Sequence, residues 1–150
     1  MLAASRNRYL FQPAFADNYG FGAWVGAHRE RLRALGPGRH YGEWWGHGIG
    51  RKYGQERRRF SLFNTARWNP AHLESVGLAD LVETVPVLHV GALGDVEGVV
   101  QALHQNGSVA APGFMKPEGV VIYHTASKSM FKRLLENDDA PKGPGQKDEG

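Results

Sequence analysis

The sequence predicts an α+β fold. Two segments carry apolar residues at helical spacing, and several short apolar segments between turn residues are typical of strands. The helix and strand candidates do not alternate regularly, which favours antiparallel pairing over repeated strand–helix–strand units. With 150 residues, of which 41% are hydrophobic and 22% charged, the chain has the length and composition of one globular domain.

The first strand candidate covers residues 2–11, and a helix is predicted to follow it. Asp17 or Asn18 can cap this helix, and Gly36 can end it in a left-handed conformation. Three glycines inside the segment lower its helical propensity. One helical face carries the larger side chains, which are Phe21, Trp24, Val25, His28, Leu32 and Leu35.

The middle of the chain is predicted to hold two strands joined by a loop. Residues 40–45 and 60–66 are the strand candidates. Residues 46–54 contain four glycines and are expected to form the loop. Residues 71–83 are expected to hold a short helix or turns.

The last part of the chain is predicted to hold a helix and three strands. Residues 85–90 are an apolar strand candidate, whose proline suits a sheet edge or a strand start. Asp95 is expected to cap a helix that runs to His104. Its apolar face consists of Val96, Val99, Val100 and Leu103. Residues 120–124 and 129–135 are the remaining strand candidates.

The C-terminal end differs in composition from the rest of the chain. From Asn137 onward the residues are mostly Asp, Pro, Gly and Lys, which cannot bury a core. We therefore expect a domain over residues 1–142 and a disordered tail over residues 143–150.

Composition excludes several kinds of site. The chain has no cysteine, so it forms no disulfide and no thiolate zinc site. Its seven histidines show no metal-ligand spacing such as His-Glu-x-x-His, and its glycines form neither a P-loop nor a dinucleotide-binding fingerprint. No apolar segment is long enough for a transmembrane helix, and the first residues lack the apolar core of a secretory signal. A cytoplasmic protein without a membrane partner is expected.

Basic residues are concentrated in one short region. The net charge is +3 and the pI about 9.3, which fits a polyanionic partner and also an ordinary protein with a slight excess of arginine. The concentrated basic and aromatic residues are Trp44, Trp45, Arg51, Lys52, Tyr53, Arg57, Arg58 and Arg59. Basic side chains interleaved with aromatic rings suit phosphate contacts and base stacking.

Four short motifs carry residues suited to nucleotide chemistry. They are Gly42-Glu43-Trp44-Trp45-Gly46, Phe60-Ser61-Leu62-Phe63-Asn64, Pro117-Glu118-Gly119-Val120-Val121-Ile122-Tyr123 and Ser129-Met130-Phe131-Lys132. In the first, a glycine lets a ligand approach the backbone, and a strand carboxylate can accept hydrogen bonds from ribose hydroxyls. In the third, a carboxylate before an apolar strand can hold Mg²⁺ or Mn²⁺ near phosphates. Taken singly, each of these residues is also compatible with an ordinary surface or core position.

The order and spacing of the four motifs resemble the adenylation domain of ATP-dependent RNA ligases. These enzymes are covalent nucleotidyltransferases, like DNA ligases and mRNA capping enzymes. The resemblance extends from Ser5-Arg6 to about Lys142. It implies two antiparallel sheets flanking a nucleotide cleft. It also implies ATP-dependent joining of RNA ends by lysine adenylation, AMP transfer to a 5′-phosphate and attack by a 3′-hydroxyl.

The resemblance assigns the adenosine side of the nucleotide to the first two motifs. Glu43 would hold the ribose hydroxyls of ATP or AMP, and either Phe60 or Phe63 would stack on the adenine. The family commonly has an aspartate where this chain has Asn64.

The resemblance assigns the phosphate side to the other motifs. Glu118 would hold Mg²⁺ or Mn²⁺, and Lys132 would act as the catalytic cation that stabilises charge on the transferring phosphoryl group. The family motif usually has a second lysine two residues earlier, where this chain has Met130, and Lys128 is a substitute candidate. Arg6 would contact the phosphate side of the nucleotide or the RNA end.

The nucleophilic lysine of the family has no counterpart where it is expected. Its Lys-x-Asp-Gly motif should precede Ser5-Arg6, and the string Lys147-Asp148-Glu149-Gly150 is out of order with no strand after it. We therefore expect an N-terminally truncated ligase core that does not complete the reaction. A non-catalytic RNA- or nucleotide-binding module, built around the basic residues 51–59, is the alternative.

Overall fold

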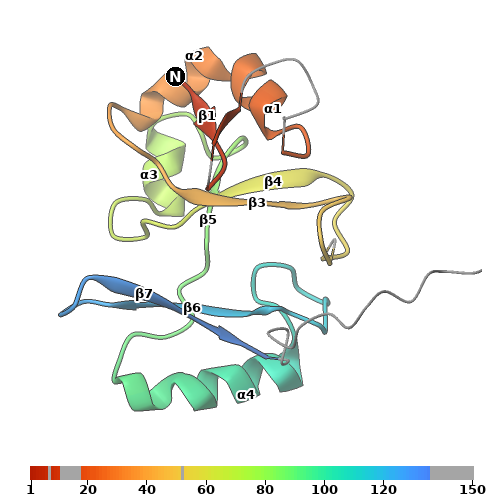
Figure 1. Cartoon of the computed structure of the whole chain (residues 1–150), viewed down its shortest axis with the longest axis vertical. Helices are drawn as coiled ribbons and strands as arrows, with labels where there is room; N and C mark the ends of the chain where they lie inside the picture. Colours follow the sequence, from red (N-terminus) through yellow and green to blue (C-terminus); the bar gives the residue numbers. More distant parts are fainter. Residues whose placement is uncertain (7, 11–17, 52, 136–150) are drawn as a thin grey trace, which may run out of the picture. The chain divides into compact units, whose positions relative to one another are not determined.

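The computed structural model describes residues 1–6, 8–10, 18–51 and 53–135. The chain divides into two compact units, Met1–Val87 (unit 1) and Leu88–Gly150 (unit 2), and each is described by itself. Figure 1 shows their helices and strands, which are mixed α and β as the sequence predicts. The tail expected over residues 143–150 lies outside the described residues.

The described residues of unit 1 contain five strands, three α-helices and a 3-10 helix. In chain order these are β1 (Ala3–Ala4), β2 (Tyr9–Leu10), α1 (Phe21–Ala27), α2 (Arg29–Leu32), η2 (Arg33–Leu35), β3 (Gly42–Gly46), β4 (Arg58–Leu62), α3 (Pro70–Ser75) and β5 (Glu83–Thr84).

The first predicted helix is present but is interrupted at His28. The backbone there has φ −107° and ψ 14°, which separates α1 from α2. The residue before α1 is Gly20, with φ 83°, so Asn18 does not occupy the capping position, and the alternative Asp17 lies outside the described residues. The helical segment ends at Gly36 (φ 81°), as predicted. All six residues of the predicted face are buried or half-buried, so the periodicity identified the correct face despite the interruption.

The central sheet of unit 1 has the order β3-β4-β5. β3 and β4 are antiparallel with Trp44 opposite Phe60, whereas β5 runs parallel to β4 with Glu83 opposite Ser61. α3 lies between β4 and β5 in the sequence and returns the chain to the same end of the sheet, which allows the parallel pairing. The expectation of two antiparallel sheets is therefore wrong: the described residues form three small sheets, one of them mixed.

The core of unit 1 lies between the central sheet and the helices. Leu62 of β4 is 1% exposed and belongs to the same cluster as Leu32 and Leu73 of the helices. Trp68, 2% exposed, joins this cluster from the turn that follows β4. That turn begins at Asn64, whose Oδ1 accepts a hydrogen bond from the Arg67 amide at 3.1 Å, so β4 ends earlier than the predicted residue 66.

Unit 2 is an amphipathic helix packed on a hairpin. Its described elements are η3 (Leu93–Asp95), α4 (Val96–Asn106), β6 (Gly119–His124) and β7 (Ser129–Leu134). Val100 and Leu103 of α4 are buried with Val120 of β6, which confirms the predicted apolar helix face. Asp95 precedes α4 as predicted, but its carboxylate accepts a hydrogen bond from the Ala92 amide at 3.1 Å and makes no cap bond to the helix.

The strand predicted over residues 85–90 does not form. Val87 and Val90 are 60% and 88% exposed, and the chain there has no regular secondary structure. The apolar residues of this segment are typical of a buried strand. Its backbone bond to the central sheet is the one that the Val85 amide donates to the Leu62 carbonyl, and the rest of the segment pairs with no strand among the described residues. None of the helices in the described residues combines the length and apolar content needed to cross a membrane.

Candidate functional site

The Gly42–Gly46 motif forms β3, and its side chains alternate between the two faces of the central sheet. Trp44 packs on the α1 side, where its ring centroid lies 5.4 Å from that of Phe21 and 5.2 Å from that of Trp24. Glu43 and Trp45 therefore belong to the opposite face, which we call the Glu43 face. Glu43 is exposed, so its carboxylate can reach a ligand.

The Glu43 face continues onto β4 and β5. Ser61 lies opposite Glu43, and its Oγ accepts a hydrogen bond from Trp45 Nε1 at 2.9 Å. Arg59 lies over the Trp45 ring, with its Cζ 5.8 Å from the ring centroid, and contacts Glu83 at 3.4 Å. This face therefore combines one exposed carboxylate with a cation–π pair and an ion pair.

The two phenylalanine candidates have different environments. Phe60 is 7% exposed on the α1 side, with its ring centroid 5.2 Å from that of Phe21. Phe63 follows β4 directly and is half-buried, and its amide donates to the Tyr41 carbonyl at 3.0 Å, so the pairing with the preceding strand continues. The pleat places residues 61 and 63 on the same side, so Phe63 is on the Glu43 face and Phe60 is in the core.

Gly42 has a packing role rather than the ligand-approach role expected from the sequence. A Cβ at this position would lie 2.5 Å from the Ser61 carbonyl oxygen and 2.7 Å from Phe60 Cζ. The Phe60 ring thus occupies the space beside the glycine, on the face opposite Glu43.

The third and fourth motifs form the β6–β7 hairpin of unit 2. Lys132 of β7 lies opposite Val121, and its Nζ contacts Glu118 Oε1 at 3.0 Å. The Lys132 and Glu118 side chains are 53% and 48% exposed, so both are accessible. The structure therefore brings together the carboxylate predicted to hold a metal ion and the lysine predicted to bind phosphate.

Comparison with protein families tests the resemblance. Residues 1–134 match the family model described as RNA ligase. The chain belongs to the RNA ligase family. The matched region contains all four motifs, which confirms the family predicted from their order and spacing. No curated protein and no solved structure matches the chain.

The other predicted ligands of this RNA ligase family member are Lys128 in unit 2 and Arg6 in unit 1. Lys128 is in the turn before β7, with φ 51°, and about 13 Å along the strand from Lys132 at ~3.3 Å per residue. It is thus poorly placed to replace a lysine at position 130. Arg6 is exposed in the β1–β2 hairpin, where the Ser5 amide donates to the Arg8 carbonyl at 2.8 Å.

The metal prediction depends on Glu118 alone. Among the described residues, no group of three or more His, Cys, Asp or Glu side chains could hold a metal ion. Mg²⁺, however, is often held by one or two carboxylates together with substrate phosphates and water, so a single carboxylate beside a phosphate-binding lysine is a suitable donor set.

Sequence reasoning passed over a Lys-x-Glu-Gly string. It is Lys116-Pro117-Glu118-Gly119, which leads directly into β6. It has a lysine and an acid in the order of the family's nucleophile motif, with glutamate in place of aspartate. Lys116 is exposed, so any test for covalent adenylation of the chain should include it.

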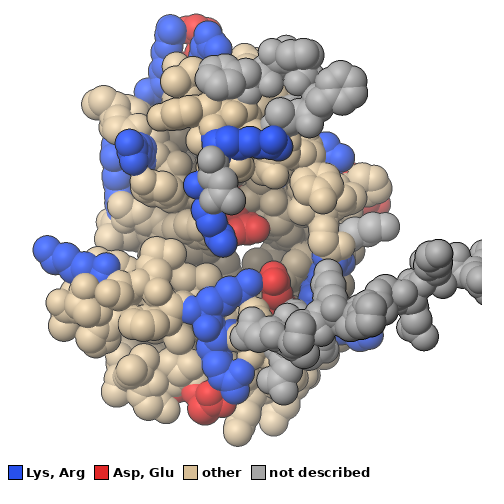
Figure 2. All heavy atoms as spheres, viewed as in Figure 1, with Lys and Arg blue, Asp and Glu red and all other residues tan. Residues whose placement is uncertain are grey.

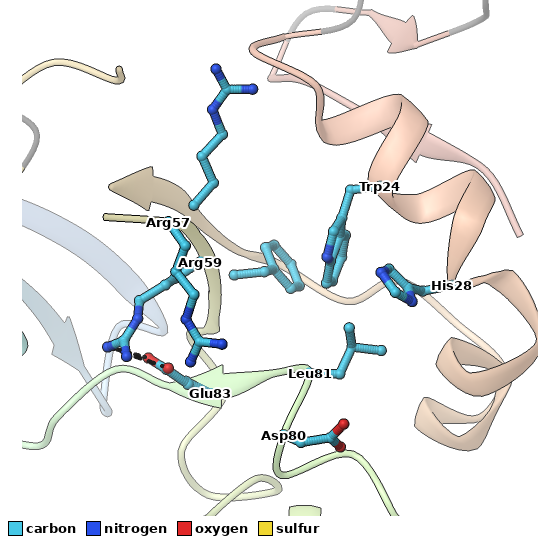
Figure 3. Close-up of a pocket in the computed structure, with 9 residues that line it drawn as sticks. Trp24, His28, Arg57, Arg59, Asp80, Leu81 and Glu83 are labelled. Carbon is cyan, nitrogen blue, oxygen red and sulfur yellow. Dashed lines mark hydrogen bonds and ion pairs between the residues drawn. The ribbon is translucent and has the colours of Figure 1, made fainter. Parts of the chain in front are cut away.

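Sequence reasoning also missed a cavity of about 240 Å³ in unit 1. Figure 3 shows Trp24 of α1 and His28, which follows α1, on one side of it and Arg57, Arg59 and Glu83 on the other. The lining residues are up to 59 positions apart in the sequence, so spacing could not associate them. The signal that the sequence offers is the run Arg57–Arg59, close to Trp44 and Trp45.

Asp80, which also lines this cavity, is held by an arginine of α2. Arg31 donates from Nη1 to Asp80 Oδ2 at 3.0 Å and from Nη2 to Oδ1 at 2.5 Å. The hydrogen bond from Arg31 lowers the pKa of the Asp80 carboxyl, and the same bond raises the pKa of Arg31. Asp80 therefore enters the cavity wall as an ion-paired carboxylate.

Proposed function

We propose that this chain is the nucleotide- and RNA-binding part of an ATP-dependent RNA ligase adenylation core. The observation that carries the proposal is the contact of Lys132 Nζ with Glu118 Oε1 at 3.0 Å. A carboxylate and an ammonium group this close can bind a metal–phosphate unit together, with the metal at Glu118 and a phosphate oxygen at Lys132. When bound, Mg²⁺ would supply charge neutralisation of the phosphates.

The adenosine side of ATP is assigned to the Glu43 face. Glu43 binds the ribose hydroxyls, and Phe63 stacks on the adenine because it shares this face with Glu43 and is not enclosed in the core. Arg6 contacts the phosphate side or the RNA end, and Lys128 makes at most a long-range contribution to phosphate binding.

The proposed function is binding without completed ligation. Covalent adenylation requires a lysine that attacks the α-phosphate and expels pyrophosphate, and the sequence contains no Lys-x-Asp-Gly motif. We expect the chain to bind ATP with Mg²⁺ and to form no acid-stable AMP adduct. An adduct detected with ATP labelled at the α-phosphate would contradict this part, and peptide mapping would show whether Lys116 carries it.

Lys132→Ala tests the nucleotide site. Removing the ammonium group should weaken ATP–Mg²⁺ binding, measured by isothermal titration calorimetry, by roughly tenfold, because a charge-assisted contact to phosphate is lost. The melting temperature should hardly change, because a half-exposed ion pair contributes about 0–1 kcal/mol.

Lys128→Ala is the matched control, since it removes the same charge from the same hairpin. Its ATP affinity should stay within about twofold of the wild-type value, in line with its distance from Lys132. Equal effects of the two variants would contradict the assignment of Lys132, and an unaltered chain that fails to bind ATP would contradict the proposed function itself.

A second function, RNA binding without nucleotide binding, is favoured by the arginine-lined cavity of unit 1. Salt-dependent binding of RNA by a chain that does not bind ATP would support it.

A further inference from the structure

The cavity in unit 1 lies where the central sheet is incomplete. β5 pairs with Ser61 and Leu62, so Arg58–Phe60 of β4 borders the cavity on its β5 side, while β3 pairs with it on the other side. Leu81 and Asp80, from the segment before β5, line the cavity with Trp24 of α1 and with His28. The cavity is therefore a consequence of a short parallel strand beside a longer one.

Positive charge is in excess around this cavity. Glu83 forms its ion pair with Arg59, and Asp80 forms its ion pair with Arg31, so both acidic residues of the wall are neutralised. Arg57 and Arg58 add two further guanidinium groups to the wall. On the face shown in Figure 2, basic side chains are likewise more prominent than acidic ones.

The two additional arginines differ in how firmly they are held. Arg58 donates from Nε to the His47 carbonyl at 3.1 Å and from Nη1 to the Tyr19 carbonyl at 2.5 Å. These acceptors are neutral, so they orient the guanidinium group without cancelling its charge. Arg57 is exposed, and Figure 3 places it on the same side of the cavity as Glu83.

Aromatic rings form the opposite side. The Trp24 ring centroid lies 5.4 Å from that of His28 and 5.8 Å from that of Phe60. Trp24 and His28 are both half-buried, so they present ring surface to the cavity while remaining fixed by their neighbours. Flat rings opposite guanidinium groups are the combination that binds single-stranded nucleic acid, through base stacking and phosphate contacts.

We propose that this cavity binds one nucleotide unit of an RNA strand, with a phosphate at Arg57 and the base against Trp24 and His28. The inference rests on the proposed function for its choice of RNA as the ligand. The volume of about 240 Å³ is below the 300–1,000 Å³ typical of pockets that enclose a whole small-molecule ligand, which favours one unit of a strand over a free nucleoside triphosphate. The contacts are to phosphate and ring faces, so binding is independent of base sequence.

Arg57→Gln tests the site by fluorescence anisotropy with a labelled, unstructured RNA of about 12 nucleotides. The variant should bind roughly three- to tenfold more weakly, because a charge-assisted phosphate contact is lost. The slope of log affinity against log salt, measured between about 50 and 200 mM, should fall by about 0.7, the value for one phosphate on a single strand.

Arg33→Gln is the matched control. It removes one positive charge from the same unit, and Arg33 does not line the cavity but pairs with Glu30 at 2.7 Å. Equal losses for the two variants would overturn the site, because they would show a response to net charge alone. An unaltered chain that does not bind the RNA at low salt would overturn it as well.

Two further measurements separate this site from the nucleotide site. RNA containing 4-thiouridine should cross-link to the tryptic peptide 9–29, which contains Trp24 and His28. ATP–Mg²⁺ affinity should be the same in Arg57→Gln and in the unaltered chain. If Arg57→Gln loses ATP affinity and keeps its RNA affinity, the assignment of RNA as the ligand is overturned. If Arg57→Gln changes neither ATP affinity nor RNA affinity, the cavity site is overturned and the proposed function stands.

Discussion

At the scale of single residues, Phe60 and Phe63 show how one strand supplies both core and ligand-binding candidates. Phe60 is 7% exposed and contacts the rings of Phe21 and Trp24. Phe63 is half-buried just after β4, on the Glu43 face. Their separation by three residues predicts opposite faces, but which face is the core depends on where α1 packs.

Replacement of each phenylalanine by alanine should therefore have different effects. Phe60→Ala should lower the free energy of unfolding by about 3–5 kcal/mol, because it opens a cavity in the aromatic cluster. Phe63→Ala should cost much less stability and should weaken ATP binding severalfold through the loss of a stacked ring. Chemical denaturation and calorimetry measure the two quantities. Normal ATP affinity in a folded Phe63→Ala variant would contradict stacking by Phe63.

Residue identity alone could not predict the cavity of unit 1 or the Glu118–Lys132 contact. Glu118 and Lys132 come from motifs that the sequence identified, but their 3.0 Å contact follows from the β6–β7 register, which places Lys132 opposite Val121. Trp24 and Asp80 were not linked by any motif, because α1 and the segment before β5 come together only through the fold.

At the scale of elements, periodic segments with a partner were predictable and short or unpaired ones were not. α4 has its predicted apolar face and ends at Gly107 (φ 79°), since both signals are local. β5 is two residues long and contains Glu83, so it has no apolar pattern to detect. Residues 85–90 have such a pattern, but strand formation also requires a neighbour with free backbone groups, and the sequence does not encode that locally.

Gly42 is tightly packed in the β3–β4 pairing, which gives a prediction for the element as a whole. Gly42→Ala would bring a Cβ to 2.5 Å from the Ser61 carbonyl oxygen, so the strand or the Phe60 ring must move. We expect a loss of about 1–3 kcal/mol in the free energy of unfolding. Gly98→Ala in α4 is the control, because no atom lies within 4 Å of its added Cβ. That change should stabilise the helix by about 0.5–1 kcal/mol. Denaturant titration of both variants checks the signs, and a neutral Gly42→Ala would contradict the packing role of Gly42.

At the scale of the whole molecule, the candidate ligands are divided between the two units. The GEWWG and FSLFN motifs and the arginine-lined cavity belong to unit 1, and Glu118 and Lys132 belong to unit 2. Each unit has a hydrophobic cluster of its own, in the helices and central sheet of unit 1 and under the hairpin of unit 2. A mutation in one hydrophobic cluster should therefore affect most the ligand-binding residues of the same unit.

The Arg31–Asp80 pair joins segments 49 residues apart, and we expect it to make the stability of unit 1 depend on pH. The hydrogen bond from Arg31 lowers the pKa of Asp80 below its ordinary value of about 3.9. A carboxyl group with a lowered pKa stabilises the folded state above its unfolded pKa, and this contribution is lost as the pH falls through its folded pKa. Asp80→Asn should therefore lower the melting temperature at pH ~7 more than at pH ~3. In an Arg31→Gln background, the effect of Asp80→Asn should depend much less on pH, and an undiminished pH dependence there would show that another group is responsible. Because Asp80 also lines the cavity, Arg31→Gln should weaken RNA binding as well, by leaving an uncompensated negative charge in the cavity wall.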